Sequence, residues 1–309
     1  MCDATFTIGQ RGSHFFQCPS KRETTRLPSK LMTFLSSSQL QQVHHIALGF
    51  QDSFLITWRD RAGLDRINSL GLPDELTDFL YTKNPQGQLI RNIPAIRCVV
   101  GPYNSSFFVH DSSAYLWMSI PDGLLQSLQS RIKNGSWIDK PRIVALGADD
   151  NFLLITEKNV AIWDLENYKT VSDMLEFARA QEHGIRDFQN IVLHSYRYGC
   201  YVAQSKTGAL LYGNLPPHQV SGITSMAEPV MRDTERAREK ERPARTSVQR
   251  RESDRESTQR RPSSLQERAR IKREWSAHKQ QFTAQSKGLK LSLSVSFGVG
   301  GLVGMLGGS

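Results

Sequence analysis

Hydrophobic and polar positions repeat one pattern along the first two thirds of the chain. A short apolar segment ends at a glycine, a polar turn follows, and a second apolar segment leads to a third that contains Trp or Tyr. The clearest copies are residues 98–117, with Gly101 and Trp117, and residues 144–163, with Gly147 and Trp163. Short runs rich in β-branched and aromatic residues, separated by turn residues, predict strands.

The pattern recurs five times. The glycines at positions 9, 49, 101 and 147 are spaced by 40 to 52 residues, and Ser195 replaces the glycine in the fifth copy. Periods of this length are typical of solenoids, propellers and arrays. We therefore predict a mainly β fold with short helices, propeller-like or an open array. Its domain spans residues 1–225, with units of approximately 5–44, 45–96, 97–142, 143–190 and 191–222.

A Leu-Pro or Ile-Pro pair closes most copies and predicts a helix, because proline is tolerated in the first helical turn. Apolar residues follow the pair at helical spacing, as Leu76, Phe79 and Leu80 do in the second copy. The same spacing occurs in the first copy at Leu31, Phe34 and Leu35. The fourth copy lacks the proline and has a longer insert with Met174, Leu175 and Ala178.

The repeated residues are interpreted first as structural. We expect the glycines to allow a tight turn or a positive φ angle. A single unit cannot bury its own apolar face. The Phe pairs, Trp117 and Trp163 are therefore expected to form the core between neighbouring units.

The fourth copy, Val144 to Gly147 followed by Phe152 to Ile155 and Val160 to Trp163, resembles the repeats of regulator-of-chromosome-condensation-type β-propellers. The resemblance covers residues 5–222. Those repeats have Asp-Gly before the Trp strand and Gly after the Trp, where this chain has Lys158-Asn159 and Asp164. The resemblance implies a propeller architecture, and no functional residue is transferred from it.

The positive charge lies in the C-terminal third. Residues 231–290 contain 18 basic and 9 acidic side chains, so their surplus equals the net charge of +9 of the whole chain. Residues 226–263 are rich in Arg, Glu, Ser and Pro, which predicts a disordered basic linker. Two Arg-Arg-x-Ser strings within it make Ser253 and Ser263 possible phosphorylation sites.

Residues 264–283 are predicted to form a basic amphipathic helix, which a capping-box pattern opens. Such a helix can bind nucleic acid, an acidic protein partner or an anionic membrane surface. It can also dock Trp275 on the repeat domain. The candidate partner-binding residues are Arg268, Arg270, Lys272, Arg273, Trp275, Lys279 and Phe282.

Residues 288–309 form an apolar segment rich in Ser and Gly. Its first half alternates apolar and small or polar residues, which predicts a half-buried strand. Residues 289–306 could self-associate, pair with a partner's sheet or add a strand to the first repeat. The segment is too short and too rich in Ser and Gly to cross a membrane as a helix.

No catalytic constellation is evident. Phosphate-binding loops, nucleophile elbows, dinucleotide-binding fingerprints and zinc-protease motifs are missing from the sequence. The four cysteines show no metal-ligand spacing. We therefore expect no enzyme activity, no cofactor and no metal. No secretory signal is evident, so a cytoplasmic or nuclear location is expected.

These observations favour a non-enzymatic protein–protein interaction scaffold of β-rich repeats with a charged regulatory tail. The first alternative is nucleic-acid or chromatin association through the basic tail, which should weaken with salt. The second is membrane-surface association or self-assembly through the C-terminal segment.

Overall fold

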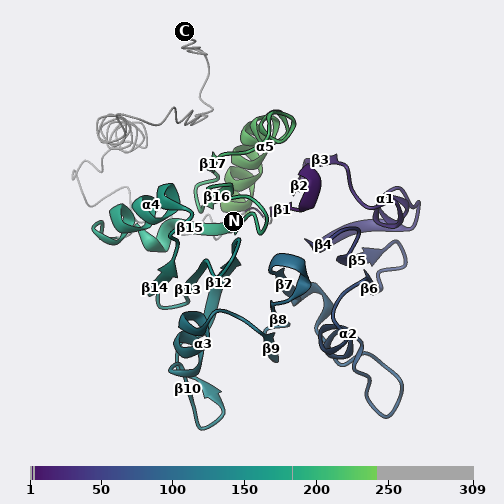
Figure 1. Cartoon of the computed structure of the whole chain (residues 1–309). Coiled ribbons are helices and arrows are strands. Elements are labelled where there is room, and N and C mark those ends of the chain that lie inside the picture. The colour runs from purple at the N-terminus through teal and green to yellow at the C-terminus, as the bar shows by residue number, and fades with distance from the viewer. Residues whose placement is uncertain (1, 3, 183, 242–309) are drawn as a thin grey trace, which may run out of the picture. The chain divides into compact units, whose positions relative to one another are not determined.

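A computed structural model describes residues 2, 4–182 and 184–241 of the chain (Figure 1). These residues form 17 strands in six small antiparallel sheets and five α-helices. The prediction of a mainly β fold is confirmed, and one helix, of 25 residues, is longer than the short helices expected. The candidate residues of the tail, from Ser253 to Phe282, and the apolar segment 288–309 lie outside the described residues.

Five sheets have three strands each, paired in sequence order. The strands are β1 (Thr5–Ile8), β2 (His14–Cys18) and β3 (Lys21–Thr25); β4 (Leu40–Leu48), β5 (Phe54–Asp60) and β6 (Asp65–Leu70); β7 (Arg97–Val100), β8 (Phe107–His110) and β9 (Tyr115–Met118); β12 (Pro141–Leu146), β13 (Phe152–Thr156) and β14 (Ala161–Asp164); β15 (Phe188–Leu193), β16 (Tyr201–Ser205) and β17 (Leu210–Gly213). A small hairpin, β10 (Ile132–Lys133) and β11 (Ser136–Trp137), forms the sixth sheet. Three sheets begin two to five residues before the predicted units, at Leu40, Pro141 and Phe188.

One α-helix follows each three-stranded sheet. The helices are α1 (Ser29–Leu35), α2 (Asp74–Tyr81), α3 (Asp122–Gln129), α4 (Lys169–Arg179) and α5 (Pro217–Glu241); four short 3₁₀ turns cover Gln10–Gly12, Ile93–Ala95, Pro102–Asn104 and Ile185–Asp187. Prolines 28, 73 and 121 directly precede the first three helices, as the Leu-Pro and Ile-Pro pairs predicted. In the fourth unit, Tyr168 takes this place, and its side chain is fully buried.

The hydrophobic core is divided into five clusters, and each lies between two successive sheets. In the cluster between the fourth and fifth sheets, Leu153 of β13 packs with Leu175 of α4 and Ile191 of β15. The fifth cluster joins the last sheet to the first, because Val202 of β16 and Met226 of α5 pack with Phe16 of β2. The helix after each sheet therefore helps to bury the face that one sheet alone would expose.

The first strands of the five sheets contact one another in a cyclic order. Strand β1 contacts β4, β4 contacts β7, β7 contacts β12, β12 contacts β15, and β15 contacts β1. Figure 1 shows these strands nearest the middle of the repeat body, with the helices farther out. Residues from all five units therefore come together along the first strands.

Helix α5 corrects one boundary of the prediction. Residues 226–241 were expected to begin a disordered linker, yet they continue this helix. Met226 and Val230 are fully buried, and the Asp233 carboxylate accepts a hydrogen bond from the Ser20 backbone N–H at 2.8 Å. The sequence hid this face, because polar residues such as Asp233 and Thr234 are buried in it beside Met226 and Val230.

The repeated glycines are required by close packing and not by a positive φ angle. The expectation of a positive φ angle at these glycines is therefore wrong. The φ angle of Gly9 is −116° and that of Gly101 is −81°, values that any residue can adopt. A Cβ atom on Gly101 would overlap the Ser106 hydroxyl. In the fifth unit the structure places His194, and not Ser195, at this position, because its N–H donates to the Cys200 carbonyl as the glycine N–H groups do in the other units.

The aromatic residues of the repeats are buried unequally. Phe107 and Phe108 of β8 are almost wholly buried, as predicted. Trp117 and Trp163 lie on third strands and are only half-buried, packed at the edge of a core cluster. Both tryptophans therefore pack against the core, but they are less buried than the prediction of core residues implied.

Candidate functional site

Five loops join the first and second strands of the three-stranded sheets, and we call them together the loop face. They are residues 10–12, 50–52, 102–105, 148–150 and 195–199. In four of them the second residue adopts a left-handed conformation, with φ between 54° and 59° at Arg11, Gln51, Tyr103 and Asp149. Residues other than glycine seldom adopt this conformation. The same tight backbone turn thus recurs around the repeats.

Hydrogen bonds tie these loops to one another. The Gln51 N–H donates to Gln10 Oε1 at 3.0 Å, and the Phe50 N–H donates to Asn104 Oδ1 at 2.8 Å. Asn104 also donates through Nδ2 to Ser53 Oγ and to the Gly71 carbonyl. These bonds span neighbouring repeats, so the loops are held as one surface and not as five independent turns.

Three aromatic rings meet on the loop face, each from a different repeat. The centroid distances are 5.1 Å between Phe50 and Tyr103, 5.8 Å between Tyr103 and Tyr196, and 6.3 Å between Phe50 and Tyr196. The Tyr103 N–H donates to the Tyr196 hydroxyl at 3.2 Å. A fourth ring, Tyr198, donates its hydroxyl proton to Asp149 Oδ2 at 2.7 Å.

Two of these side chains are exposed in spite of their contacts. Tyr103 is 67% exposed and Tyr198 is 54% exposed. Single exposed aromatics are ordinary, but a group of them on one ordered surface is typical of a binding site. The loop face therefore presents exposed aromatic side chains on an ordered surface.

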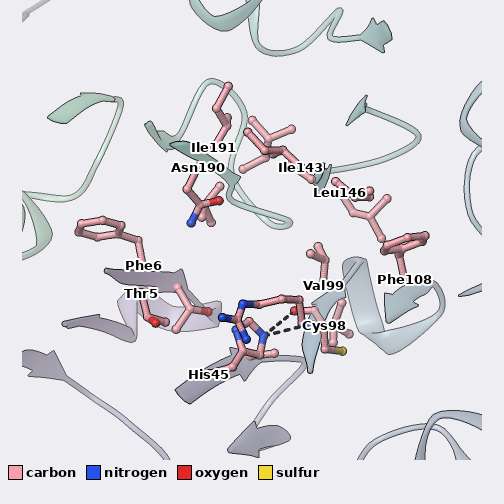
Figure 2. A pocket seen from close by; sticks show the side chains of 18 of the residues that line it. Thr5, Phe6, His45, Cys98, Val99, Phe108, Ile143, Leu146, Asn190 and Ile191 are labelled. Atoms are coloured by element: carbon pink, nitrogen blue, oxygen red, sulfur yellow. Dashed lines mark hydrogen bonds between the residues drawn. The ribbon is translucent and has the colours of Figure 1, made fainter. Parts of the chain in front are cut away.

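The first strands line a central cavity of about 440 Å³, and all five sheets contribute residues to its lining. Figure 2 shows Thr5 and Phe6 of β1, His45 of β4 and Asn190 of β15 around it, facing Ile143 of β12. At the end of these strands nearest the loop face, the Ser195 hydroxyl lies 3.2 Å from the Val100 carbonyl oxygen and 3.3 Å from that of Leu146. The side chain of Ser195 thus spans the third, fourth and fifth units at that end.

His45 joins two units inside the cavity. Its Nε2 atom lies 3.1 Å from the Cys98 nitrogen, whose N–H donates to it, and 3.0 Å from the Cys98 carbonyl oxygen (Figure 2). Burial lowers the pKa of His45 to about 3, and the nearby charge of Arg97 acts in the same direction. The imidazole is therefore neutral at physiological pH and serves as a hydrogen-bond acceptor.

The other end of the first strands is basic. Arg97 begins β7, Arg142 lies at the start of β12, and Lys206 directly follows β16; all three line the cavity. No Asp or Glu side chain is among its lining residues in the described part of the chain. Within residues 4–182 and 184–241, none of the three forms an ion pair.

The two arginines are held by backbone carbonyl groups. Arg97 Nη1 donates to the carbonyls of Pro94 and Ile96, at 2.9 and 2.8 Å. Arg142 donates to the carbonyls of Thr156, Ile185 and Phe188, and burial lowers its pKa. Carbonyl oxygens fix the position of a guanidinium group without cancelling its full charge.

Metal binding and thiol chemistry find little support in the described residues. They contain no group of three or more His, Cys, Asp or Glu side chains placed to hold a metal ion. All four cysteines are buried, and burial raises the pKa of Cys98 and of Cys200 to about 12. Their thiols are therefore poor nucleophiles. Among the same residues, no helix has the length and apolar character to cross a membrane.

Sequence patterns missed the residues of both surfaces. Phe50, Tyr103 and Tyr196 each follow the repeat glycine or its equivalent by one or two positions, and this recurrence was the available signal. Arg97 and His45 each stand four residues before the glycine of their repeat, which was the signal for the cavity.

No protein-family model matches the chain, and no curated protein matches it. Its function must therefore be inferred from the loop face and the central cavity.

Proposed function

We propose that this chain is a non-enzymatic protein–protein interaction scaffold, built on five β-rich repeats that form a propeller-like ring. The cyclic order of the first-strand contacts, with β15 against β1, supports the ring. The core cluster that joins α5 and the last sheet to the first sheet supports it as well. The resemblance of the fourth repeat to propeller repeats agrees with this arrangement.

The observation that carries the proposal is the pair of exposed but anchored tyrosines on the loop face. Tyr103 and Tyr198 come from different repeats; the Tyr103 backbone N–H donates to Tyr196 and the Tyr198 hydroxyl donates to Asp149, in each case on another loop. Tyrosine provides a large contact area at low cost in conformational entropy, and such anchors dominate binding energies in many interfaces. A surface that is already ordered loses little further entropy when a partner binds.

The charges of the loop face favour a protein over a nucleic acid. Arg11 and Arg197 are exposed there, as are the acidic residues Asp52, Asp149 and Asp150. Nucleic-acid binding depends on a surplus of positive charge along one surface. A face of mixed sign around an aromatic centre has the composition of a protein interface.

The test is partner capture from native lysate with the full-length chain and two variants, each with and without nuclease. The double variant Tyr103→Ser with Tyr198→Ser removes both anchors. The control, Leu64→Ser with Ile90→Ser, removes two side chains of similar exposure that lie outside the loop face (54% and 48% exposed). We expect at least one protein partner to be kept by the control and by nuclease treatment but lost with the double variant. That partner, once purified, should bind the double variant about tenfold or more weakly.

Two results would overturn the proposal. Partners that are retained equally by both variants would show that the loop face is not the binding surface. Recovery that disappears with nuclease, whatever the state of the loop face, would support the alternative of nucleic-acid association through the basic tail. That alternative is favoured by the surplus of nine positive charges in residues 231–290.

A further inference from the structure

We propose that the basic end of the central cavity is a binding site for a small organic phosphate. Its phosphate group would lie against Arg97, Arg142 and Lys206, and its apolar part would enter the cavity between the first strands. This inference concerns the end of the first strands opposite the loop face and does not depend on the scaffold function.

The first argument is the charge of the lining. Arginine and lysine side chains contribute three positive charges, and none of the described lining residues carries a negative charge. Burial and the charges of Arg142 and Arg186 lower the pKa of Lys206, and Asp187, outside the lining, raises it by less. Positive groups that are held together without counter-charges destabilise the fold slightly, and an anion removes this cost when it binds.

The second argument is the hydrogen-bonding capacity that remains. Arg97 uses only Nη1 for the Pro94 and Ile96 carbonyls, which leaves Nε and Nη2 as donors among the described residues. The ammonium group of Lys206 likewise has no hydrogen-bond acceptor within residues 4–182 and 184–241. A planar guanidinium and an ammonium group together suit a phosphate, whose oxygens accept several hydrogen bonds.

The third argument is the shape of the site. A volume of about 440 Å³ lies in the range of small-molecule pockets, which are mainly apolar with a few polar groups at fixed places. Figure 2 shows Val99, Ile143, Leu146 and Ile191 around the cavity, with Phe108 at its side. Inorganic phosphate alone would leave these apolar side chains without contacts, so a phosphate with an apolar body fits better.

His45 and Asn190 add polar groups without adding charge. Burial holds His45 neutral by lowering its pKa to about 3, and His110, which also lines the cavity, has a pKa lowered to about 4. The specific attraction for an anion at neutral pH therefore comes from the two arginines and the lysine. Binding should depend on these three side chains and not on the histidines.

The test is calorimetric titration of the full-length chain with phenyl phosphate at about 150 mM salt, where long-range attraction by the basic tail is screened. Benzyl alcohol serves as the neutral probe and inorganic phosphate as the probe without an apolar body. We expect saturable binding of phenyl phosphate, weaker binding of inorganic phosphate and no binding of benzyl alcohol. Lack of saturable phenyl phosphate binding would overturn the proposal.

Two variants locate the site. Arg97→Gln with Lys206→Gln removes two cavity charges, and Arg61→Gln with Lys133→Gln removes two charges from exposed positions outside the cavity. The first should weaken phenyl phosphate binding about tenfold or more, and the second should leave it unchanged. Equal affinities of the two variants would assign the binding to the tail or the surface.

A second measurement needs no variant and therefore does not depend on its folding. Lys206 and Lys133 are acetylated in the unmodified chain by an amine-specific reagent, and the rates are followed by mass spectrometry. Phenyl phosphate should slow the acetylation of Lys206 and leave that of Lys133 unchanged. Equal rates at Lys206 with and without the probe would overturn the proposal.

Discussion

The two ends of the first strands differ in how their polar groups are satisfied. At the loop end, polar groups of one repeat bond to groups of the next, as Asn104 does with the Phe50 N–H. At the basic end, Arg97 donates to backbone carbonyls and Arg142 to backbone carbonyls and the Asn159 amide oxygen, and neither arginine forms an ion pair among the described residues. The same five first strands thus carry different residues at their two ends, and we propose a different kind of partner for each end.

This difference is the basis of our two proposals, a protein partner at the loop end and a small organic phosphate at the basic end. The polar groups of the loops bond to one another, and aromatic rings such as that of Tyr103 stay exposed to solvent. Charges at the edge of a lined cavity attract an anion into a confined space. Both ends depend on the contact between the last and the first sheets, so the largest effect is expected where that contact is removed.

Truncation within helix α5 should have the largest effect, because it affects both ends. A chain of residues 1–225 loses Met226 and Val230, which are fully buried between the last and first sheets. We expect it to be less stable than residues 1–241 by about 4 kcal/mol or more, enough to unfold many domains. Circular dichroism during thermal unfolding measures this difference. Equal stability of the two chains would show that α5 does not close the repeats.

Acid should destabilise both ends through buried histidines. Burial lowers the pKa of His45 to about 3 and that of His194, near the loop end, to about 4. An exposed histidine titrates near 6.5, so between pH 6.5 and 4 the unfolded chain binds protons that the folded chain does not. The contribution of each buried histidine to the free energy of unfolding is therefore fully present above about pH 6.5. It is lost as the pH decreases, by roughly 2 to 3 kcal/mol per histidine.

Urea unfolding at several pH values checks this expectation. The variant His194→Gln should lose less stability than the wild-type chain between pH 6.5 and 4, whatever its stability at neutral pH. Equal losses in both chains would show that His194 is not buried in the way described.

The hydroxyl of Tyr168 tests the loop end alone. It accepts a hydrogen bond from the Ala148 N–H at 2.8 Å and donates one to the His194 carbonyl at 2.6 Å, and so joins the fourth and fifth loops. Tyr168→Phe leaves the buried Ala148 N–H unpaired and removes one of the two hydrogen bonds to the His194 carbonyl, which also accepts from the Arg197 N–H, and should cost about 2 kcal/mol. Tyr212→Phe, which removes a half-exposed hydroxyl near Thr224, should cost little. If chemical denaturation gives the same loss of unfolding free energy for both variants, the hydrogen bonds of the Tyr168 hydroxyl contribute nothing to stability.

The smallest effect concerns the repeat glycine. Gly101→Ala should cost about 1 to 2 kcal/mol, because the new Cβ would overlap the Ser106 hydroxyl. Ser106→Ala in the same chain removes that hydroxyl and should restore at least half of the loss. A double-mutant cycle measures the coupling. Without any restoration, the cost would come from the backbone and not from the close approach.

The sequence predicted the features that are local. The Leu-Pro pairs correctly marked the starts of α1 and α2, and the spacing of Leu76, Phe79 and Leu80 correctly gave the buried face of a helix. These features depend on neighbouring residues only. The repeat period likewise follows from counting along the chain.

The rest depends on contacts between distant residues. Tyr103 and Tyr196 meet across 93 positions, so no local pattern brings them together. Arg97 and Arg142 share a cavity only because the first strands of all five sheets surround it. The buried face of residues 226–241 was missed because it packs between the last and the first sheets, and the first sheet lies about 200 residues earlier in the chain.

The most direct test compares the two ends in one binding experiment with the purified partner from the capture. Its affinity is measured for the wild-type chain, for Tyr103→Ser with Tyr198→Ser, and for Arg97→Gln with Lys206→Gln. Our account predicts about tenfold or more weaker binding for the tyrosine variant and an unchanged affinity for the basic variant. The reverse order, or an equal loss in both, would contradict the assignment of the protein partner to the loop face.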